Sequence, residues 1–398
     1  MHTLLKSQSF DPQANRLFAS ELALPADKPA KLSPRLRQKL LYMHISSFDW
    51  IHGGLKTPIK FLDRDSVEYS LCQSAMHDKN EERMARLSLN SAMALLDHDQ
   101  GGIYQFATED AWKSSHYSKT IAAQAGSLRL YALAYAQFHD HPYLQTTRHI
   151  CDFLRSKLLS KSGAFQSAAT DNIVNLSNYH GKSNERVTAF KIRENGWACE
   201  ALAACHEFTG DADALEMAEG CMRWLLDQPR CARGGFGDDR EAAPVLADNL
   251  AVARAALQMY RITMNRDYLQ HAADISHFIC SNFYNDAGGF STVKDLDAGV
   301  STTRQIDENI CLARFLNLLH YYLDEEAFLH MARHGLSYLA TPEVATSRIE
   351  EAGILLLDEE LNSTPLKIQI VASGIPGKAT KLAETALRYF GWYKVIHC

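Results

Sequence analysis

Hydrophobic positions along the chain form a pattern that recurs in four segments of low mutual identity. Each segment carries one apolar stripe at the spacing of an amphipathic helix of about three turns. The equivalent leucines that open the stripes are Leu144, Leu215, Leu269 and Leu329. Because they recur at a similar register, the pattern predicts a repeated helical unit.

A second helix, apolar almost all round, precedes each amphipathic helix. It starts near a carboxamide, and the four carboxamides are Gln124, Asn195, Asn249 and Asn309. Gly-rich turns follow the amphipathic helices at Gly163, Gly234 and Gly288. Each unit is therefore predicted to be helix, turn, helix and a Gly-rich loop with a short extended piece.

These two kinds of helix indicate an inner ring of buried helices inside an outer ring of half-exposed ones. Residues 35–100 leave room for two less regular hairpins, which brings the total to about six. We therefore predict an all-α (α/α)6 toroid, or six-hairpin barrel, with short Gly-rich β loops. The expected parts are an N-terminal arm (1–40), the toroid (41–365) and a strand–helix–strand appendage of the same domain (366–398).

In such a ring the inner helices run parallel, so their N-termini gather at one mouth of a central cavity. The four carboxamides, with Glu194, Asp248 and Glu308 beside three of them, are expected to line this mouth. Helix capping alone is the other explanation for these polar residues. As ligand groups, Glu194 and Asp248 would be catalytic carboxylates, and Glu308 and the carboxamides would bind substrate.

Residues 97–124 crowd reactive side chains into one loop between helical patterns. His116 is the expected proton-transfer residue, although it could equally hold the loop in place. Substrate-binding candidates are aromatic side chains that can stack on a sugar ring, and polar side chains near the Gly-rich loops. They are Trp50, Tyr104, Trp112, His52 and Lys119. Core packing and surface exposure are the alternatives for these residues.

The composition of the chain argues against several kinds of partner and site. The net charge of −6 and the absence of basic runs argue against nucleic acid and anionic membranes as partners. No apolar stretch approaches the ~20 residues of a spanning helix, so we expect a cytoplasmic protein. The nine scattered cysteines include no CxxC pair, which argues against disulfides and a thiolate zinc site. We expect neither metal nor cofactor.

Residues 97–125 resemble the long DHxGGGFxRYSxDxxWxxPHFEKMLYDQA segment of the YyaL-type family, known also from spermatogenesis-associated thioredoxin-domain proteins. Matches include Asp97, Trp112, His116 and Lys119. The resemblance implies a toroid akin to six-hairpin glycosidases and N-acylglucosamine 2-epimerases, and it allows for a separate thioredoxin-like partner. Three of the family's acidic positions differ, because Ser118 replaces a glutamate and the paired acids of the DAD segment are replaced by Thr170 and Asn172 around Asp171.

The sequence thus predicts a carbohydrate-active enzyme with a small carbohydrate-like ligand in the toroid cavity. The expected reaction is epimerisation or isomerisation of a sugar, or glycoside hydrolysis, by general acid–base catalysis. The alternative is a non-catalytic carbohydrate-binding or scaffold protein that has lost the acids. The oligomeric state is left open.

Overall fold

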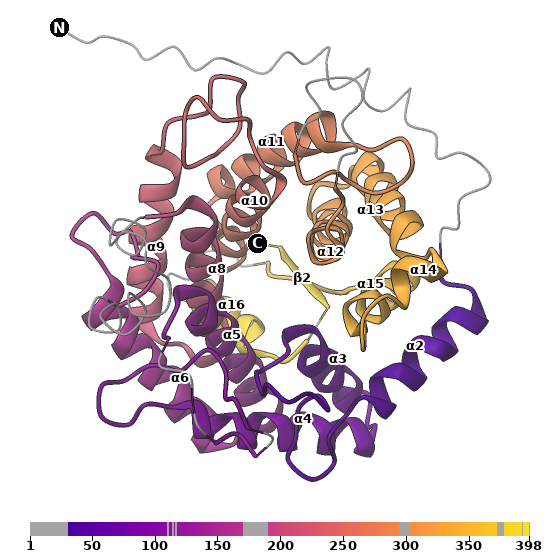
Figure 1. The fold of residues 1–398 in the computed structure, drawn as a ribbon. Coiled ribbons are helices and arrows are strands. Elements are labelled where there is room, and N and C mark those ends of the chain that lie inside the picture. The colour runs from indigo at the N-terminus through magenta and orange to yellow at the C-terminus, as the bar shows by residue number, and fades with distance from the viewer. Residues whose placement is uncertain are drawn as a thin grey trace, which may run out of the picture.

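The computed structural model describes residues 31–109, 111–113, 115, 118–169, 190–293, 303–371, 378–391 and 393–397. Within these ranges, helices form two concentric rings around a common axis (Figure 1). The inner ring consists of α3 (Arg64–Ala75), α5 (Ile121–Phe138), α8 (Ile192–Thr209), α10 (Leu246–Thr263), α12 (Ile306–Leu323) and α15 (Ala352–Asn362). The outer ring consists of α2 (Pro34–Ser46), α4 (Lys79–Ala92), α6 (His141–Phe153), α9 (Ala212–Asp227), α11 (Arg266–Phe283) and α13 (Glu326–Leu339). Each inner helix contacts the next, and α15 contacts α3, so the ring closes. The predicted (α/α)6 toroid is confirmed.

Four of the hairpins share one design. Helices α5, α8, α10 and α12 are each 18 residues long, and each ends at a left-handed residue. One further residue then leads into the next outer helix, as Asp211 does between Gly210 and α9. Asp211 caps α9 by accepting hydrogen bonds from the N–H groups of Asp213 and Ala214. These short links lie at one end of the barrel, and the long Gly-rich loops lie at the other.

The first hairpin shows where the predicted boundary was wrong. Helix α2 begins at Pro34, and the Ser33 hydroxyl accepts a hydrogen bond from the Leu36 N–H at its start. The predicted limit between arm and toroid at residue 40 falls inside this helix. Leu36 and Leu40 are buried against the ring, because they form the apolar stripe of an outer helix.

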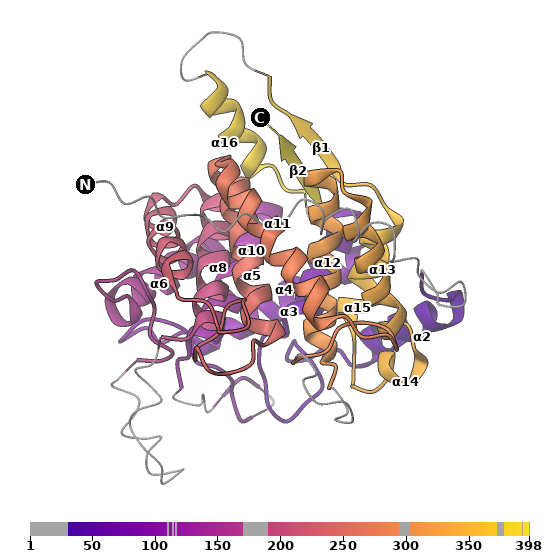
Figure 2. The same cartoon turned by 90° about the horizontal axis from the view of Figure 1, so that it is seen from above.

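The C-terminal appendage closes one end of the barrel. Strand β1 (Leu366–Gln369) pairs in parallel with β2 (Lys394–His397), and α16 (Lys378–Arg388) connects them, as predicted. Figure 2 shows these elements at the end of the ring opposite the long loops. Lys394 is fully buried beneath the inner helices, where its ammonium group lies 3.1 Å from the Glu207 carboxylate and donates to the Leu387 and Tyr389 carbonyls.

Charged side chains also pair around the barrel axis, where inner helices face one another. Glu68 of α3 accepts hydrogen bonds from Arg129 of α5 and Arg314 of α12. Arg314 reaches Glu360 of α15 as well. The axis is therefore polar, while the apolar core fills the space between the two rings.

Removing the buried cation of the appendage should destabilise the barrel. Lys394→Ala leaves Glu207 without one of its partners and removes the donor from the carbonyls of Ala386, Leu387 and Tyr389, so we expect a loss of about 3 kcal/mol in the free energy of unfolding. Lys367→Ala, on the exposed face of β1, is the matched control, with an expected change within about 0.5 kcal/mol. Urea unfolding measures both, and equal effects would contradict a closing role for Lys394.

Candidate functional site

A cavity of about 540 Å³ opens where the N-termini of the inner helices converge. This volume is within the usual range of small-molecule sites. Tyr104 and Trp197 contribute aromatic surface, and Arg64, Arg129, Glu200 and Arg254 contribute charge. Acidic groups are numerous around it. They are Asp63, Asp65, Asp307, Glu350 and Glu351.

Arginines form the floor of this cavity, because Arg64, Arg129 and Arg254 also border a smaller cavity of about 100 Å³ deeper along the axis. Each has a carboxylate partner. The Arg254 guanidinium donates to Glu200 at 2.6 Å, and the Arg64 Nε donates to Asp65 at 2.9 Å. The floor is thus a set of fixed guanidinium groups oriented by acids.

A carboxyl pair stands in the cavity wall. Asp63 caps α3 through the Ser66 N–H, and Glu350 accepts from the Ala352 N–H at the start of α15. The two carboxyl groups are within hydrogen-bonding reach of each other, and such a contact requires a shared proton. Burial, together with the negative charges of Glu350 and Asp65, raises the pKa of Asp63 to about 8.

A buried histidine lies behind this pair. The Nδ1 atom of His44 is 3.6 Å from Glu350, and its Nε2 atom is 3.2 Å from Glu81. Burial alone would lower the pKa of His44, but the hydrogen bonds and charges of Glu350 and Glu81 raise it to about 9. His44 is therefore an imidazolium at neutral pH, and it keeps a positive charge beside the carboxyl pair.

A second carboxyl group with a raised pKa, that of Glu351, belongs to the cavity lining. Burial raises the pKa of Glu351 to about 7, although Arg348 opposes the shift. The Arg348 guanidinium lies 2.6 Å from Glu351 and 2.9 Å from Asp307. The cavity lining thus includes two carboxyl groups, those of Asp63 and Glu351, whose pKa values are raised into the neutral range.

The four carboxamides do not line the cavity, contrary to the sequence prediction. Each is fully buried and binds the backbone of the preceding Gly-rich loop. Asn249, for example, accepts from the Phe236 N–H and donates to the Phe236 carbonyl, at 2.8 and 3.1 Å. The corresponding pairs are Gln124 with Ile103, Asn195 with Phe165, and Asn309 with Phe290. We call this arrangement the carboxamide clamp.

Glycine is required next to three of the four clamps, at Gly102, Gly235 and Gly289, whereas the Asn195 clamp has Ala164 at the equivalent position. Gly235 has φ of +74°, and a Cβ atom there would lie 2.8 Å from the Asn249 carboxamide oxygen and 2.4 Å from the Phe278 ring. The Gly-Gly pairs of the sequence therefore belong to the clamp and not to a ligand-binding loop.

The predicted acids do not line the cavity, although the charges of Asp248 and Glu308 interact. Asp248 lies 4.0 Å from Arg193, and burial, with the charge of Asp238, raises its pKa to about 6. Glu308 accepts from the Thr292 hydroxyl at 2.9 Å, and burial raises its pKa too. Glu194 accepts a hydrogen bond from the Ser167 hydroxyl.

The crowded loop is explained mainly by its own folding. Lys119 is buried and binds the Asp97 carboxylate and the Gly101 carbonyl, and Asp97 accepts from the Tyr104 hydroxyl at 2.7 Å. Lys60 and Asp49 form an equivalent pair at the preceding Gly-rich loop, 2.8 Å apart. Both lysines hold loops in place. Lys119 is therefore not available to a ligand, and its predicted role in substrate binding is wrong.

The remaining predicted residues are dispersed. The Trp112 indole N–H donates to the His52 carbonyl at 2.8 Å, which buries the ring between loops. His52 itself is half-exposed beside Asp49. Trp50 borders an outer groove on α4 and not the cavity. Of the aromatic candidates, Tyr104 reaches the cavity, and His116 lies outside the described residues.

Sequence reasoning missed the charged residues of the floor, although a signal for them exists. Each nearly apolar inner helix carries a charged residue at the same position, five residues after its carboxamide. These residues are Arg129, Glu200, Arg254 and Arg314. A repeated charge inside an apolar helix indicates a common polar axis.

Two further observations bear on ligands. Within the described ranges, one group of side chains, Cys151, Cys205 and Asp211, has atoms close enough to hold a metal ion, and it lies apart from the cavity lining. Among the same residues, none of the helices has the length and hydropathy required to cross a bilayer.

Loss of a clamp should destabilise the fold. Asn249→Ala leaves the buried Phe236 N–H and carbonyl unpaired, so we expect a loss of about 2–4 kcal/mol in unfolding free energy. Asn80→Ala, exposed on α4, is the control and should change stability by less than about 0.5 kcal/mol. Denaturant titration makes the measurement, and a stable Asn249→Ala variant would reopen a ligand role for the carboxamides.

The carboxyl pair should give stability a characteristic pH dependence. Because the pKa of Asp63 is raised from 3.8 to about 8, the folded state retains a proton that the unfolded chain loses within that window. Stability should therefore fall as pH rises from about 4 to 8. In Asp63→Asn this part of the slope should vanish in thermal unfolding series. Asp78→Asn, a change at the exposed cap of α4, should leave the slope unchanged.

No protein-family model matches the chain. The cellobiose 2-epimerase of Eubacterium cellulosolvens is 27% identical over 143 residues, which are 35% of this chain and 33% of that protein. The match thus spans about a third of the relative's length.

Solved structures are similar over most of the ring. The cellobiose 2-epimerase of Bacillus thermoamylovorans matches with a TM-score of 0.61 and 13% identity, over 77% of this chain and 86% of that one. A D-mannose isomerase matches with a TM-score of 0.58 and 13% identity, over 78% and 87% of the two chains. The chain therefore has the toroid fold found in these sugar-converting enzymes.

Proposed function

We propose that the chain is a sugar epimerase or isomerase that moves a proton at carbon 2 of an open-chain aldose. The observation that carries the proposal is the placement of the Asp63 and Glu350 carboxyl groups together in the wall of a cavity that Arg64, Arg129 and Arg254 also line. The similarity to a cellobiose 2-epimerase and the fold shared with a mannose isomerase support it.

The cavity suits a hydroxyl-rich ligand. Trp197 and Tyr104 offer aromatic faces for the C–H side of a sugar ring, and the floor arginines offer N–H donors to hydroxyl oxygens. Since every floor arginine already has a carboxylate partner, the floor does not demand an anionic ligand. A neutral sugar fits this balance of charge better than a sugar phosphate.

The chemistry follows from the carboxyl pair. The ionised member removes the proton from carbon 2, and the electron pair moves toward the carbonyl oxygen to give an enediolate. A guanidinium such as that of Arg64 stabilises the developing negative charge on oxygen. Return of the proton to the other face of carbon 2 gives the epimer, and its return to carbon 1, with proton exchange between the two oxygens, gives the ketose.

Asp248 favours a second candidate, glycoside hydrolysis. Its pKa of about 6 suits a general acid, and Glu308 lies in the same cluster around Arg193. In that reaction Asp248 would protonate the leaving oxygen. His116 remains a predicted proton-transfer residue in either reaction. A YyaL-type relationship, a thioredoxin-like partner and a cytoplasmic location also remain predictions.

Deuterium incorporation tests the proposal. Incubation with D-glucose, D-mannose, N-acetylglucosamine or cellobiose in D2O should exchange the carbon 2 hydrogen, as followed by proton NMR. Asp63→Asn and Glu350→Gln should each slow the exchange at least about 100-fold, because proton transfer needs the pair. The control Glu343→Gln, exposed on α14 (Pro342–Ala345), should keep the wild-type rate.

Other outcomes identify the alternatives. Release of reducing ends from oligosaccharides without exchange, lost in Asp248→Asn, would favour hydrolysis. Sugar binding in thermal shift assays with neither activity would favour the non-catalytic protein. Deuterium exchange at carbon 2 that persists in both carboxyl variants but is lost in His116→Ala would indicate that His116, and not the carboxyl pair, is the base.

A further inference from the structure

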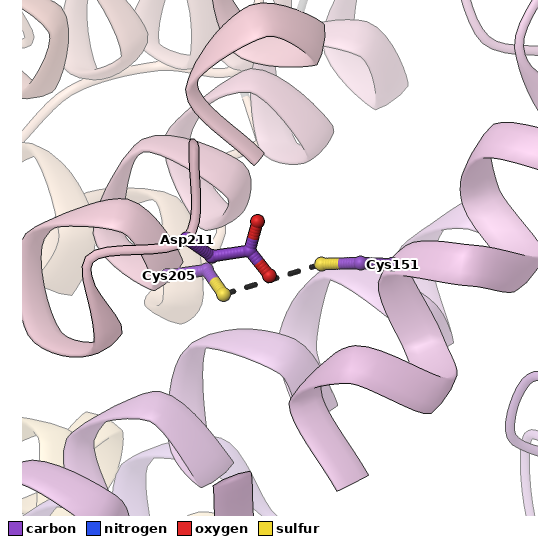
Figure 3. A group of neighbouring side chains, drawn as sticks. All are labelled: Cys151, Cys205 and Asp211. Carbon is purple, nitrogen blue, oxygen red and sulfur yellow. Dashed lines mark hydrogen bonds between the residues drawn. The ribbon is translucent and has the colours of Figure 1, made fainter. Parts of the chain in front are cut away.

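Two cysteines and an aspartate from three separate elements converge between the rings. Cys151 lies on the outer helix α6, Cys205 on the inner helix α8, and Asp211 at the cap of α9 (Figure 3). The two Sγ atoms are 4.0 Å apart, and all three ligand atoms lie within 4.8 Å of one another. The Asp211 carboxylate points toward the two sulfur atoms.

This geometry is close to that of a tetrahedral metal site. With a zinc–sulfur bond of about 2.3 Å, two thiolates on one ion lie about 3.8 Å apart, slightly closer than these sulfurs. The carboxylate can serve as ligand without losing its capping role, because one oxygen, Oδ1, accepts both N–H groups of α9. A water molecule would complete a four-coordinate shell.

We infer that Cys151, Cys205 and Asp211 bind a thiophilic divalent cation, with Zn²⁺ as the natural occupant. Two sulfurs select against Mg²⁺ and Ca²⁺, which require oxygen ligands. Binding converts two thiols to thiolates and releases two protons per ion. The half-exposed Asp211 offers an entry route to the buried sulfurs.

The site would be structural, and it does not depend on the proposed function. It joins α6 of one hairpin to the α8–α9 hairpin that follows. The absence of a CxxC motif is no objection, because Cys151 and Cys205 are 54 residues apart and only the packing of α6 on α8 brings them together.

Cadmium titration of the fully reduced protein tests the inference. One Cd²⁺ per chain should produce the ultraviolet absorption of cadmium–thiolate bonds, and Zn²⁺ should displace it. Cys151→Ser and Cys205→Ser should each weaken Cd²⁺ binding at least about 100-fold. Asp211→Asn retains the cap of α9 while removing the charge, and it should weaken binding about tenfold or more.

Cys221→Ser is the matched control, because Cys221 is a buried thiol beside Cys199 that lies outside the group of three. It should bind Cd²⁺ like the wild type. Failure of the reduced wild-type protein to show the thiolate absorption would overturn the inference, as would equal losses in Cys221→Ser and Cys151→Ser. A chain that binds no ion when reduced and forms a Cys151–Cys205 disulfide in air would also overturn it.

Discussion

The carboxamide clamp is the interaction on which the ring depends. Each clamp satisfies a buried N–H and carbonyl of a loop that would otherwise leave them unpaired, at a large cost in free energy. Because the carboxamide stands in the first turn of an inner helix and the loop follows an outer helix, one side chain fixes the two rings to each other. The four inner helices that carry a clamp, α5, α8, α10 and α12, are consequently held at the same level by their N-terminal turns.

The fold was predictable because its signals are local. Hydrophobic periodicity, Gly-rich turns and regular carboxamides define the hairpins without any knowledge of distant contacts. The same carboxamides also predict a cavity mouth lined for a ligand, and that prediction is wrong, because sequence position shows where a helix begins but not which partner a side chain finds. The loop at residues 97–124 was misleading for the same reason, since Asp97 and Lys119 bind each other.

The candidate site was less accessible to sequence reasoning. Asp63 and Glu350 lie near opposite ends of the part of the sequence that forms the toroid. They meet only because α15 packs against α3. No local pattern encodes such a meeting. The floor arginines had a usable signal in their common register, but a charged residue in an apolar helix is informative only once the ring and its axis are known. Carboxylates are the predicted chemical type and also occur in the cavity lining. The residues differ, because Asp63 and Glu350 line the cavity and the predicted Glu194 and Asp248 do not.

The closing of the ring by charged pairs has a consequence for how the molecule assembles. Arg314 and Glu68 are 246 residues apart in sequence, so their pairing must await nearly the whole chain. Glu68 can pair with Arg129 once the second hairpin is present, but Arg314 and Glu360 come only with the last helices. The axis therefore acquires its full set of ion pairs only when α12 and α15 are in place. Asp63 and Glu350 have the same requirement, so the cavity with its carboxyl pair exists only in the finished ring.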